Sequence, residues 1–166
     1  MICVGGGIGA APIYPIARAL KEAGNEIITI IGARSENLLI FEEELSRVSD
    51  EVIITTDDGS KGRHWLVTDP LKEILQGRKK IDLVFAIGPA IMMKFVCLTT
   101  KPAQVKTLVS LNPIMVDGTG MCGACRVSVG GETKFGCVDG PDFDGHEVDF
   151  DLLLVRQRMY LEEEKK

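Results

Sequence analysis

Three of the five cysteines in the chain lie within sixteen residues, as Cys122, Cys125 and Cys137. Their spacing is C-x2-C-x11-C, and Asp117 stands where a further ligand would complete C-x4-C-x2-C…C, a pattern typical of loops that hold a 2Fe-2S cluster. A carboxylate is anionic and hard enough to ligate ferric iron. Glycines between these residues allow positive φ and bring loop N–H groups close to cluster sulfides. The four side chains are therefore the predicted metal ligands.

Two other kinds of site use the same C-x2-C pair. Structural zinc is one, but its second half is usually another C-x2-C or an H-x3-5-H pair, which this sequence lacks. A redox dithiol is the other, but it should begin a helix after a strand, whereas this pair lies in a glycine-rich loop before a predicted hairpin. A disulfide is disfavoured because no secretory signal is present. The sequence favours iron and sulfide, with zinc as the main alternative.

A second candidate site is the glycine-rich turn that follows the short apolar strand Met1–Val4. The turn contains Gly5, Gly6, Gly7 and Gly9. An amphipathic helix ending at Gly24 and an isoleucine-rich strand, Glu26–Ile31, are predicted after it. In such a β-α-β unit the turn lets a pyrophosphate approach the helix N-terminus. The spacing is G-G-G-x-G and not G-x-G-x-x-G, so a tight turn without a ligand stays an alternative.

Other candidate residues follow the later predicted strands, at the same edge of the predicted sheet as the glycine turn. The acid expected to bind the ribose hydroxyls is missing after the second strand, and Arg34-Ser35 stands there instead. Arg34 is either a solvated arginine or a contact to the ribose or a phosphate. Asp57 opens a polar loop at the end of the third strand, which is either part of the nucleotide site or an ordinary surface loop. Gly88-Pro89 ends the strand Asp82–Ile87.

Alternating strands and helices predict a doubly wound parallel sheet, an α/β fold with helices on both faces. The remaining predicted elements are a helix over Leu38–Val48, a strand over Glu51–Thr56, a helix with Asp69 as N-cap and Pro70 at N1, a helix over Ala90–Leu98 and a strand over Val105–Leu111. After residue 111 the sequence predicts a hairpin with Gly130-Gly131 at its turn, an acidic irregular tail from Asp139 and a terminal helix over Leu152–Glu164. We therefore expect a nucleotide-binding domain over 1–111, a cluster lobe over 112–148 and a C-terminal helix over 149–166.

Composition excludes several classes of function. The net charge is −5, aromatic residues make up 5% of the chain, and no basic patch is present, so nucleic acid and anionic membranes are not expected partners. No apolar run reaches 18 residues and no signal peptide is recognisable, which predicts a soluble, cytoplasmic protein. Cys3 and Cys97 lie in apolar stretches and are expected to be buried and inert. His64 and His146 have no partner at metal-ligand spacing.

With the glycine turn, the Gly88-Pro89 turn and the cysteine loop in this order, the chain resembles the ferredoxin–NADP reductase superfamily. It is most similar to electron-transfer subunits with a C-terminal 2Fe-2S cluster, above all the sulfide dehydrogenase-like small subunit of NADH-dependent ferredoxin:NADP oxidoreductase, and also the dihydroorotate dehydrogenase electron-transfer subunit. The stretches that carry the resemblance are Gly5–Pro15, Gly32–Leu45, Thr56–Gly62, Gly88–Met93, Ser110–Cys125 and Cys137–Gly145. The resemblance covers essentially the whole chain.

The resemblance implies a role for each candidate residue. The glycines of the first turn would hold the pyrophosphate of NAD(H) or NADP(H), Arg34 and Ser35 would lie by the adenosine ribose, and Gly88-Pro89 would lie near the nicotinamide. NADH is the expected nucleotide. In dihydroorotate-type subunits the first cluster ligand is Cys, so Asp117 points to the ferredoxin:NADP oxidoreductase branch. Ile87 stands where many superfamily members have Cys, so no thiol is expected beside the hydride.

Members of this superfamily also have an N-terminal flavin-binding barrel, which has no counterpart in this sequence. Hydride carries two electrons and a 2Fe-2S cluster accepts one, so FAD is required between them. We therefore expect the flavin-binding domain to lie outside these residues, a larger oxidoreductase subunit to be the partner, and this chain to be inactive by itself.

Overall fold

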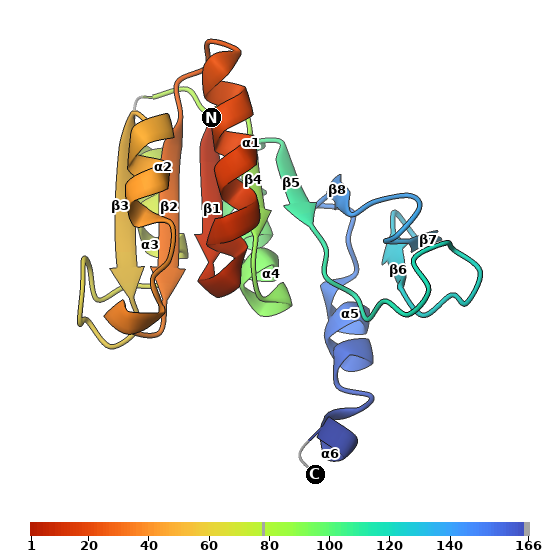
Figure 1. Ribbon diagram of the computed structural model, residues 1–166. Coiled ribbons are helices and arrows are strands. Elements are labelled where there is room, and N and C mark those ends of the chain that lie inside the picture. Colours follow the sequence, from red (N-terminus) through yellow and green to blue (C-terminus); the bar gives the residue numbers. More distant parts are fainter. Residues whose placement is uncertain (78, 165–166) are drawn as a thin grey trace.

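In the described residues, 1–77 and 79–164, the computed structural model has a main sheet of six strands in the order β3-β2-β1-β4-β5-β8 (Figure 1). The strands are β1 Ile2–Gly6, β2 Ile28–Ala33, β3 Glu51–Thr56, β4 Val84–Ile87, β5 Thr107–Ser110 and β8 Asp142–Asp144. The first five are parallel and β8 is antiparallel to β5. The predicted parallel α/β fold is confirmed, with one antiparallel strand added at its edge.

Helices connect the parallel strands and cover both faces of the main sheet, and two further helices follow the last strand. They are the short helix η1 Gly7–Gly9, α1 Ala10–Glu22, the short helix η2 Glu36–Leu38, α2 Glu42–Val48, α3 Thr68–Gln76, α4 Ala90–Thr100, α5 Phe150–Gln157 and α6 Leu161–Glu164. Figure 1 shows α1 and α2 on one face and α3 and α4 on the other. A separate hairpin, β6 Arg126–Val129 and β7 Glu132–Phe135, follows the cysteine loop and confirms the predicted turn.

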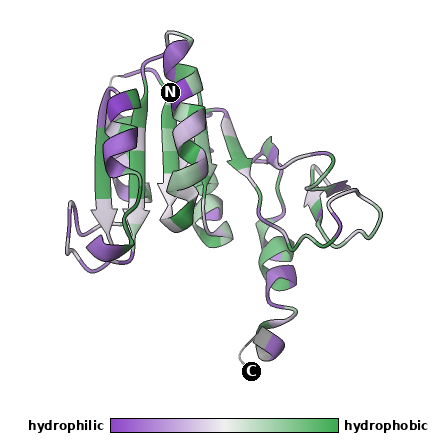
Figure 2. Ribbon diagram, in the orientation of Figure 1, coloured by the Kyte–Doolittle hydropathy of each residue, from purple (hydrophilic) through white to green (hydrophobic). Residues whose placement is uncertain are grey.

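Two apolar cores result from the alternation of side chains along the strands. Ile2 and Val4 of β1 point into the core beneath α3 and α4, whereas Cys3 points into the core beneath α1 and α2. Most of the central strands take the hydrophobic colour in Figure 2, while hydrophilic residues lie on loops and outer helix faces. Cys3 and Cys97 are buried, as expected. Burial raises the pKa of the Cys3 thiol to about 11 and that of Cys97 to about 12.

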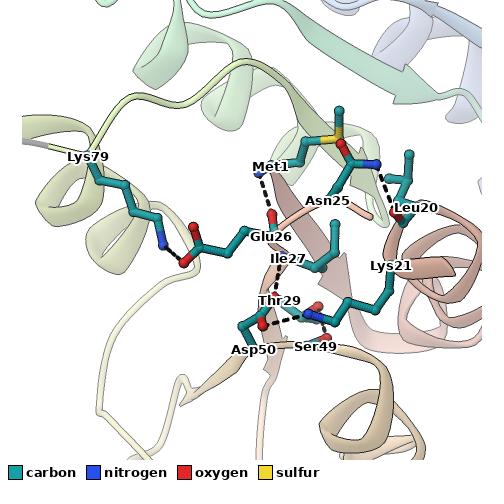
Figure 3. Close-up of polar contacts among 10 residues, drawn as sticks. All are labelled: Met1, Leu20, Lys21, Asn25, Glu26, Ile27, Thr29, Ser49, Asp50 and Lys79. Carbon is teal, nitrogen blue, oxygen red and sulfur yellow. Dashed lines mark hydrogen bonds and ion pairs between the residues drawn. The ribbon is translucent and has the colours of Figure 1, made fainter. Parts of the chain in front are cut away.

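Polar contacts close the amino-terminal edge of the sheet (Figure 3). The Asp50 carboxylate accepts a hydrogen bond from the backbone N–H of Ile27 at 2.8 Å and pairs with Lys21 at 2.6 Å. Beside them, the hydroxyls of Thr29 and Ser49 lie 2.7 Å apart. These contacts join α1 to the starts of β2 and β3.

Four details differ from the sequence-based expectations. The helix predicted over Leu38–Val48 is interrupted, because Phe41 has φ of 61° and packs 5.8 Å from the Tyr14 ring, so α2 begins only at Glu42. The third helix begins one residue before Asp69, whose carboxylate instead accepts a hydrogen bond from the Leu66 N–H.

The other two differences lie after the cysteine loop. β8 forms within the tail that was expected to be irregular, because Phe143 is buried and pairs with Val109 of β5. The terminal helix begins earlier than expected and divides into α5 and α6, with its first end capped by the Asp149 carboxylate. Residues 165 and 166 lie outside the described residues. The domain boundaries stay a prediction, and β8 shows that part of 112–148 adds to the main sheet. No helix in the described ranges has the length and apolar character needed to cross a bilayer.

Candidate functional site

The glycine turn lies at the point where the strand order changes direction. From β1 the chain runs outward to β2 and β3, then returns to add β4 on the other side of β1. Ligands of open α/β sheets bind at such switch points, outside the carboxyl ends of the strands. Gly5–Gly9 spans the end of β1 and the short helix η1, and Gly88-Pro89 follows β4, so the fold brings the two predicted turns together.

The two turns approach each other so closely that an added Cβ would collide with backbone at Gly9 and with a neighbouring side chain at Gly6. A Cβ at Gly9 would lie 2.2 Å from the Ile87 carbonyl oxygen. A Cβ at Gly88 would lie 3.0 Å from the Gly6 oxygen, and one at Gly6 would lie 2.3 Å from the Met92 sulfur. Gly7 has φ of 55° and nothing within 4 Å of its Cβ position, so it faces open space. The result is a glycine turn at the N-terminal end of α1 that packs closely on the end of β4 and faces open space at Gly7, which suits a pyrophosphate.

The next two strand ends hold the remaining predicted nucleotide residues. Arg34 and Asp57 are exposed and Ser35 is half-buried. The loop after β3 bonds back to the end of β2, because the N–H of Asp57 donates to Ala33 at 3.0 Å and that of Asp58 donates to Arg34 at 3.1 Å. Arg34, Ser35 and Asp57 therefore lie along one edge with the glycine turns, as the sequence predicted. Their contacts to a nucleotide stay predictions.

Asp117 organises the cysteine loop through its backbone. Its two carboxylate oxygens accept hydrogen bonds from the N–H groups of Thr119 and Cys122, each at 2.8 Å. The hydrogen bond from Thr119 is the main reason that the pKa of Asp117 lies below its usual value. The carboxylate stays ionised at neutral pH, which a metal ligand requires.

The three cysteines of the loop are not equally placed. The sulfurs of Cys125 and Cys137 lie 3.2 Å apart, whereas Cys122 is exposed and its sulfur accepts the Ala124 N–H at 3.4 Å. A hydrogen bond from the backbone of Cys137 lowers the pKa of Cys125, and the side-chain hydrogen bond to Cys125 raises the pKa of Cys137. Within residues 1–77 and 79–164, no three His, Cys, Asp or Glu side chains are arranged to hold an ion. The ligand role of all four residues stays a prediction.

The chemistry of the loop nevertheless fits a 2Fe-2S cluster. It offers three thiols and an ionised carboxylate on one short segment, and its backbone donates an N–H to a cysteine sulfur. Asp117, Cys122, Cys125 and Cys137 are the side chains that would hold the iron. The cluster would supply one-electron transfer.

Some residues that shape these sites were not found from the sequence. Ser60 accepts the Glu36 N–H at 2.7 Å and Lys61 pairs with Glu42 at 2.6 Å, so both fix the loop that lies over the end of β2. Arg156 and Gln157 of α5 bond to the cysteine loop. The only sequence signal for Arg156 and Gln157 is that they lie within the predicted terminal helix, which is too general to assign a role.

Comparison with known families agrees with both halves of this site. Residues 1–98 match the family described as oxidoreductase NAD-binding domain, and residues 112–149 match the iron-sulfur cluster binding domain of dihydroorotate dehydrogenase B. The second match contains Asp117 and all three cysteines of the loop.

Individual relatives are longer than this chain. A protein of Thermotoga maritima named dihydroorotate dehydrogenase B (NAD(+)), electron transfer subunit homolog is 55% identical over 99% of this chain and 58% of its own length. A protein of Methanocaldococcus jannaschii named probable dihydroorotate dehydrogenase B (NAD(+)), electron transfer subunit is 39% identical over 90% of this chain and 57% of its own length. The chain thus spans less than two thirds of these relatives.

A solved structure has the same fold over nearly the whole chain. It comes from the NADH-dependent reduced ferredoxin-NADP oxidoreductase, described in connection with flavin-based electron bifurcation. The TM-score is 0.92 at 51% identity, covering 99% of this chain and 59% of the solved one. The expected ferredoxin reductase-like fold is confirmed. The chain belongs to the oxidoreductase NAD-binding domain family, and it joins that domain to a cluster-binding domain of the dihydroorotate dehydrogenase B type.

Proposed function

We propose that the chain is the nucleotide-binding and cluster-bearing part of a flavin-dependent NAD(P)H oxidoreductase. In the complete enzyme, electrons would pass from the nucleotide through a flavin and then singly to a larger partner subunit. The observation that carries the proposal is that the glycine turn Gly5–Gly9 and the cysteine loop lie on one chain, with the loop following β5 of the same sheet. Each site alone has other uses, but together they suit the conversion of a two-electron donor into a one-electron source.

The flavin would be held outside the residues described above. Nicotinamide supplies a hydride and an iron–sulfur cluster exchanges single electrons, so a flavin must lie between them. Residues 1–166 by themselves should therefore retain no stoichiometric FAD or FMN through gel filtration and should not reduce dyes with NADH. A yellow protein that kept its flavin would show that the flavin site is misplaced in this proposal.

NADH is the proposed nucleotide, because the similarity is to an NADH-dependent enzyme and to NAD(+)-dependent subunits. The exposed Arg34 at the end of β2 is the feature that could instead bind a 2′-phosphate. Calorimetric titration of the complete enzyme with both reduced nucleotides should give the lower dissociation constant for NADH. Tighter binding of NADPH would contradict this choice and would indicate that Arg34 binds the 2′-phosphate.

Metal and sulfide analysis tests the cluster directly. Anaerobically purified protein should be coloured and should contain iron and acid-labile sulfide in equal amounts. A colourless protein with one zinc per chain would contradict the proposal and would indicate a non-catalytic nucleotide-binding module with a structural metal. The acceptor subunit is proposed by class only; an oxidoreductase large subunit of the ferredoxin:NADP type is preferred to a dihydroorotate dehydrogenase or hydrogenase partner, because of Asp117.

A further inference from the structure

The C-terminal helix α5 holds the cysteine loop at two points. Arg156 donates a hydrogen bond from Nη2 to the Ala124 carbonyl oxygen at 3.0 Å. Gln157 donates from Nε2 to the carbonyl oxygen of Asn112 at 2.9 Å and to its side-chain oxygen at 3.1 Å. Ala124 lies between two of the predicted cysteine ligands, and Asn112 lies where the chain leaves β5. One helix therefore fixes both the centre and the base of the loop.

The helix that supplies these contacts is itself firmly placed. Phe150 and Leu153 belong to the main core and are 5% and 2% exposed. The backbone N–H of Asp149 donates to Ser128 of β6 at 2.9 Å. Since residues three and four apart share a helix face, the buried Leu153 directs Arg156 and Gln157 inward toward the loop. The loop is thus anchored to the core through α5.

The contact at Ala124 determines how one peptide group is turned. A trans peptide places its C=O and N–H on opposite sides, and the one cis bond among the described residues is Gly140-Pro141. With the Ala124 oxygen held by Arg156, the N–H of Cys125 points away from α5. On the preceding peptide, the Ala124 N–H donates to the Cys122 sulfur. Arg156 therefore fixes the orientation of the loop backbone between two cysteines.

Arg156 also lines the same cavity as a cysteine of the loop. The cavity measures about 280 Å³, and Cys122 and Arg126 line it as well. Arg126 donates to the Gly123 carbonyl oxygen at 3.0 Å, so two guanidinium groups bond to adjacent carbonyls of the loop. Arg156 is partly shielded from solvent, whereas Arg126 is exposed, so the charge of Arg156 is less screened by water and salt.

We propose that Arg156 is a positioning residue for the iron–sulfur site, which holds the Cys122–Cys125 segment in its binding conformation and favours the reduced state by its charge. The inference rests on the proposed cluster. Removal of this side chain should leave the glycine turn Gly5–Gly9 unchanged, because that turn lies at the carboxyl ends of β1 and β4. The expected effects are faster loss of the cluster and a lower reduction potential.

The test compares Arg156→Gln, Arg156→Lys and the control Arg158→Gln in the complete protein, loaded with iron and sulfide under anaerobic conditions. Arg158 is exposed and lies two positions along, so its replacement removes the same charge without the contact. Loss of visible absorption after addition of an iron chelator measures retention, and a dye-mediated titration measures the potential. Outer-shell partners of metal ligands typically contribute about 10–100-fold in affinity. We expect Arg156→Gln to lose its cluster at least about tenfold faster than native protein.

The two other variants separate geometry from charge. Arg156→Lys should keep the native potential but recover only part of the retention, while Arg158→Gln should match the native protein in both. If Arg156→Gln lowers the melting temperature of the unloaded protein severely, Gln157→Ala at the exposed second contact should still speed cluster loss. Equal retention and potential in Arg156→Gln and native protein would overturn the inference alone. A native protein that binds no iron or sulfide would overturn the proposed function and the inference with it.

Discussion

Replacement of Gly9 by alanine is the most direct test of the close packing between the glycine turn and the end of β4. The added Cβ would lie 2.2 Å from the Ile87 carbonyl oxygen and 2.7 Å from its carbonyl carbon, far inside the 3.0 Å that such contacts tolerate. Both obstructing atoms belong to the backbone of β4, so η1 and the start of α1 must move away from the end of β4. Overpacking typically costs about 1–3 kcal/mol, and we expect the upper end, about 3 kcal/mol, because no flexible side chain can move aside.

Gly6→Ala is the matched control in the same glycine turn. Its Cβ would meet the Met92 sulfur at 2.3 Å, but that atom is the far end of a flexible side chain and can rotate away. We expect a cost near 1 kcal/mol, the lower end of the same range.

Thermal unfolding followed by circular dichroism measures both substitutions. For a chain of this size each kcal/mol lowers the melting temperature by about 2–4 °C, so Gly9→Ala should melt about 6–12 °C below native protein and Gly6→Ala about 2–4 °C below. Gly9→Ala should also weaken NADH binding, because the turn that would hold the pyrophosphate is displaced. The reasoning fails if Gly9→Ala is no less stable than Gly6→Ala.

Three further outcomes are expected. Gly7→Val should weaken nucleotide binding by crowding the phosphates without changing the cluster spectrum, whereas Gly24→Val, at a similar positive φ remote from the glycine turn, should lower stability but not affinity. Asp117→Ala should give a labile cluster, and Asp117→Cys should retain it at a lower reduction potential; full occupancy in Asp117→Ala would limit Asp117 to its loop hydrogen bonds. The hydrogen bond from Lys21 lowers the pKa of Asp50 below 3.8, so the ionised carboxylate stabilises the folded state above pH 3.8, and this contribution is lost as the pH falls further. The difference in melting temperature between native protein and Asp50→Asn should therefore disappear when both are melted in acid.

The parallel sheet and its turns could be predicted because each signal is local. Central strands such as β4 are continuous apolar runs, and glycines follow where two strand ends approach each other. The positions of Arg34 and Asp57 then follow from topology alone, since parallel strands end at one edge. These parts of the site depend on strand order and backbone geometry.

Elements that depend on distant contacts could not be predicted. β8 contains the buried Phe143 between two exposed aspartates, a pattern too short to distinguish from a loop. Its place is set by pairing with β5 and by the close approach of Gly145 to the Cys97 sulfur. Likewise the apolar spacing around Phe41 fits one long helix equally well, and only the packing on Tyr14 explains the break before α2.

Two roles are open to Asp117 in the cysteine loop. It can ligate iron, as the sequence predicts, or it can cap the loop by accepting hydrogen bonds from backbone N–H groups. The structure shows the capping contacts, one N–H on each carboxylate oxygen. Two carboxylate oxygens offer about four lone-pair positions, so two accepted hydrogen bonds leave capacity on both atoms. The capping bonds also fix the orientation of the carboxylate and keep it ionised, which assists ligation. One aspartate can therefore hold the loop and bind the metal, whereas a cysteine in its place has a single sulfur, which accepts weaker hydrogen bonds than two carboxylate oxygens.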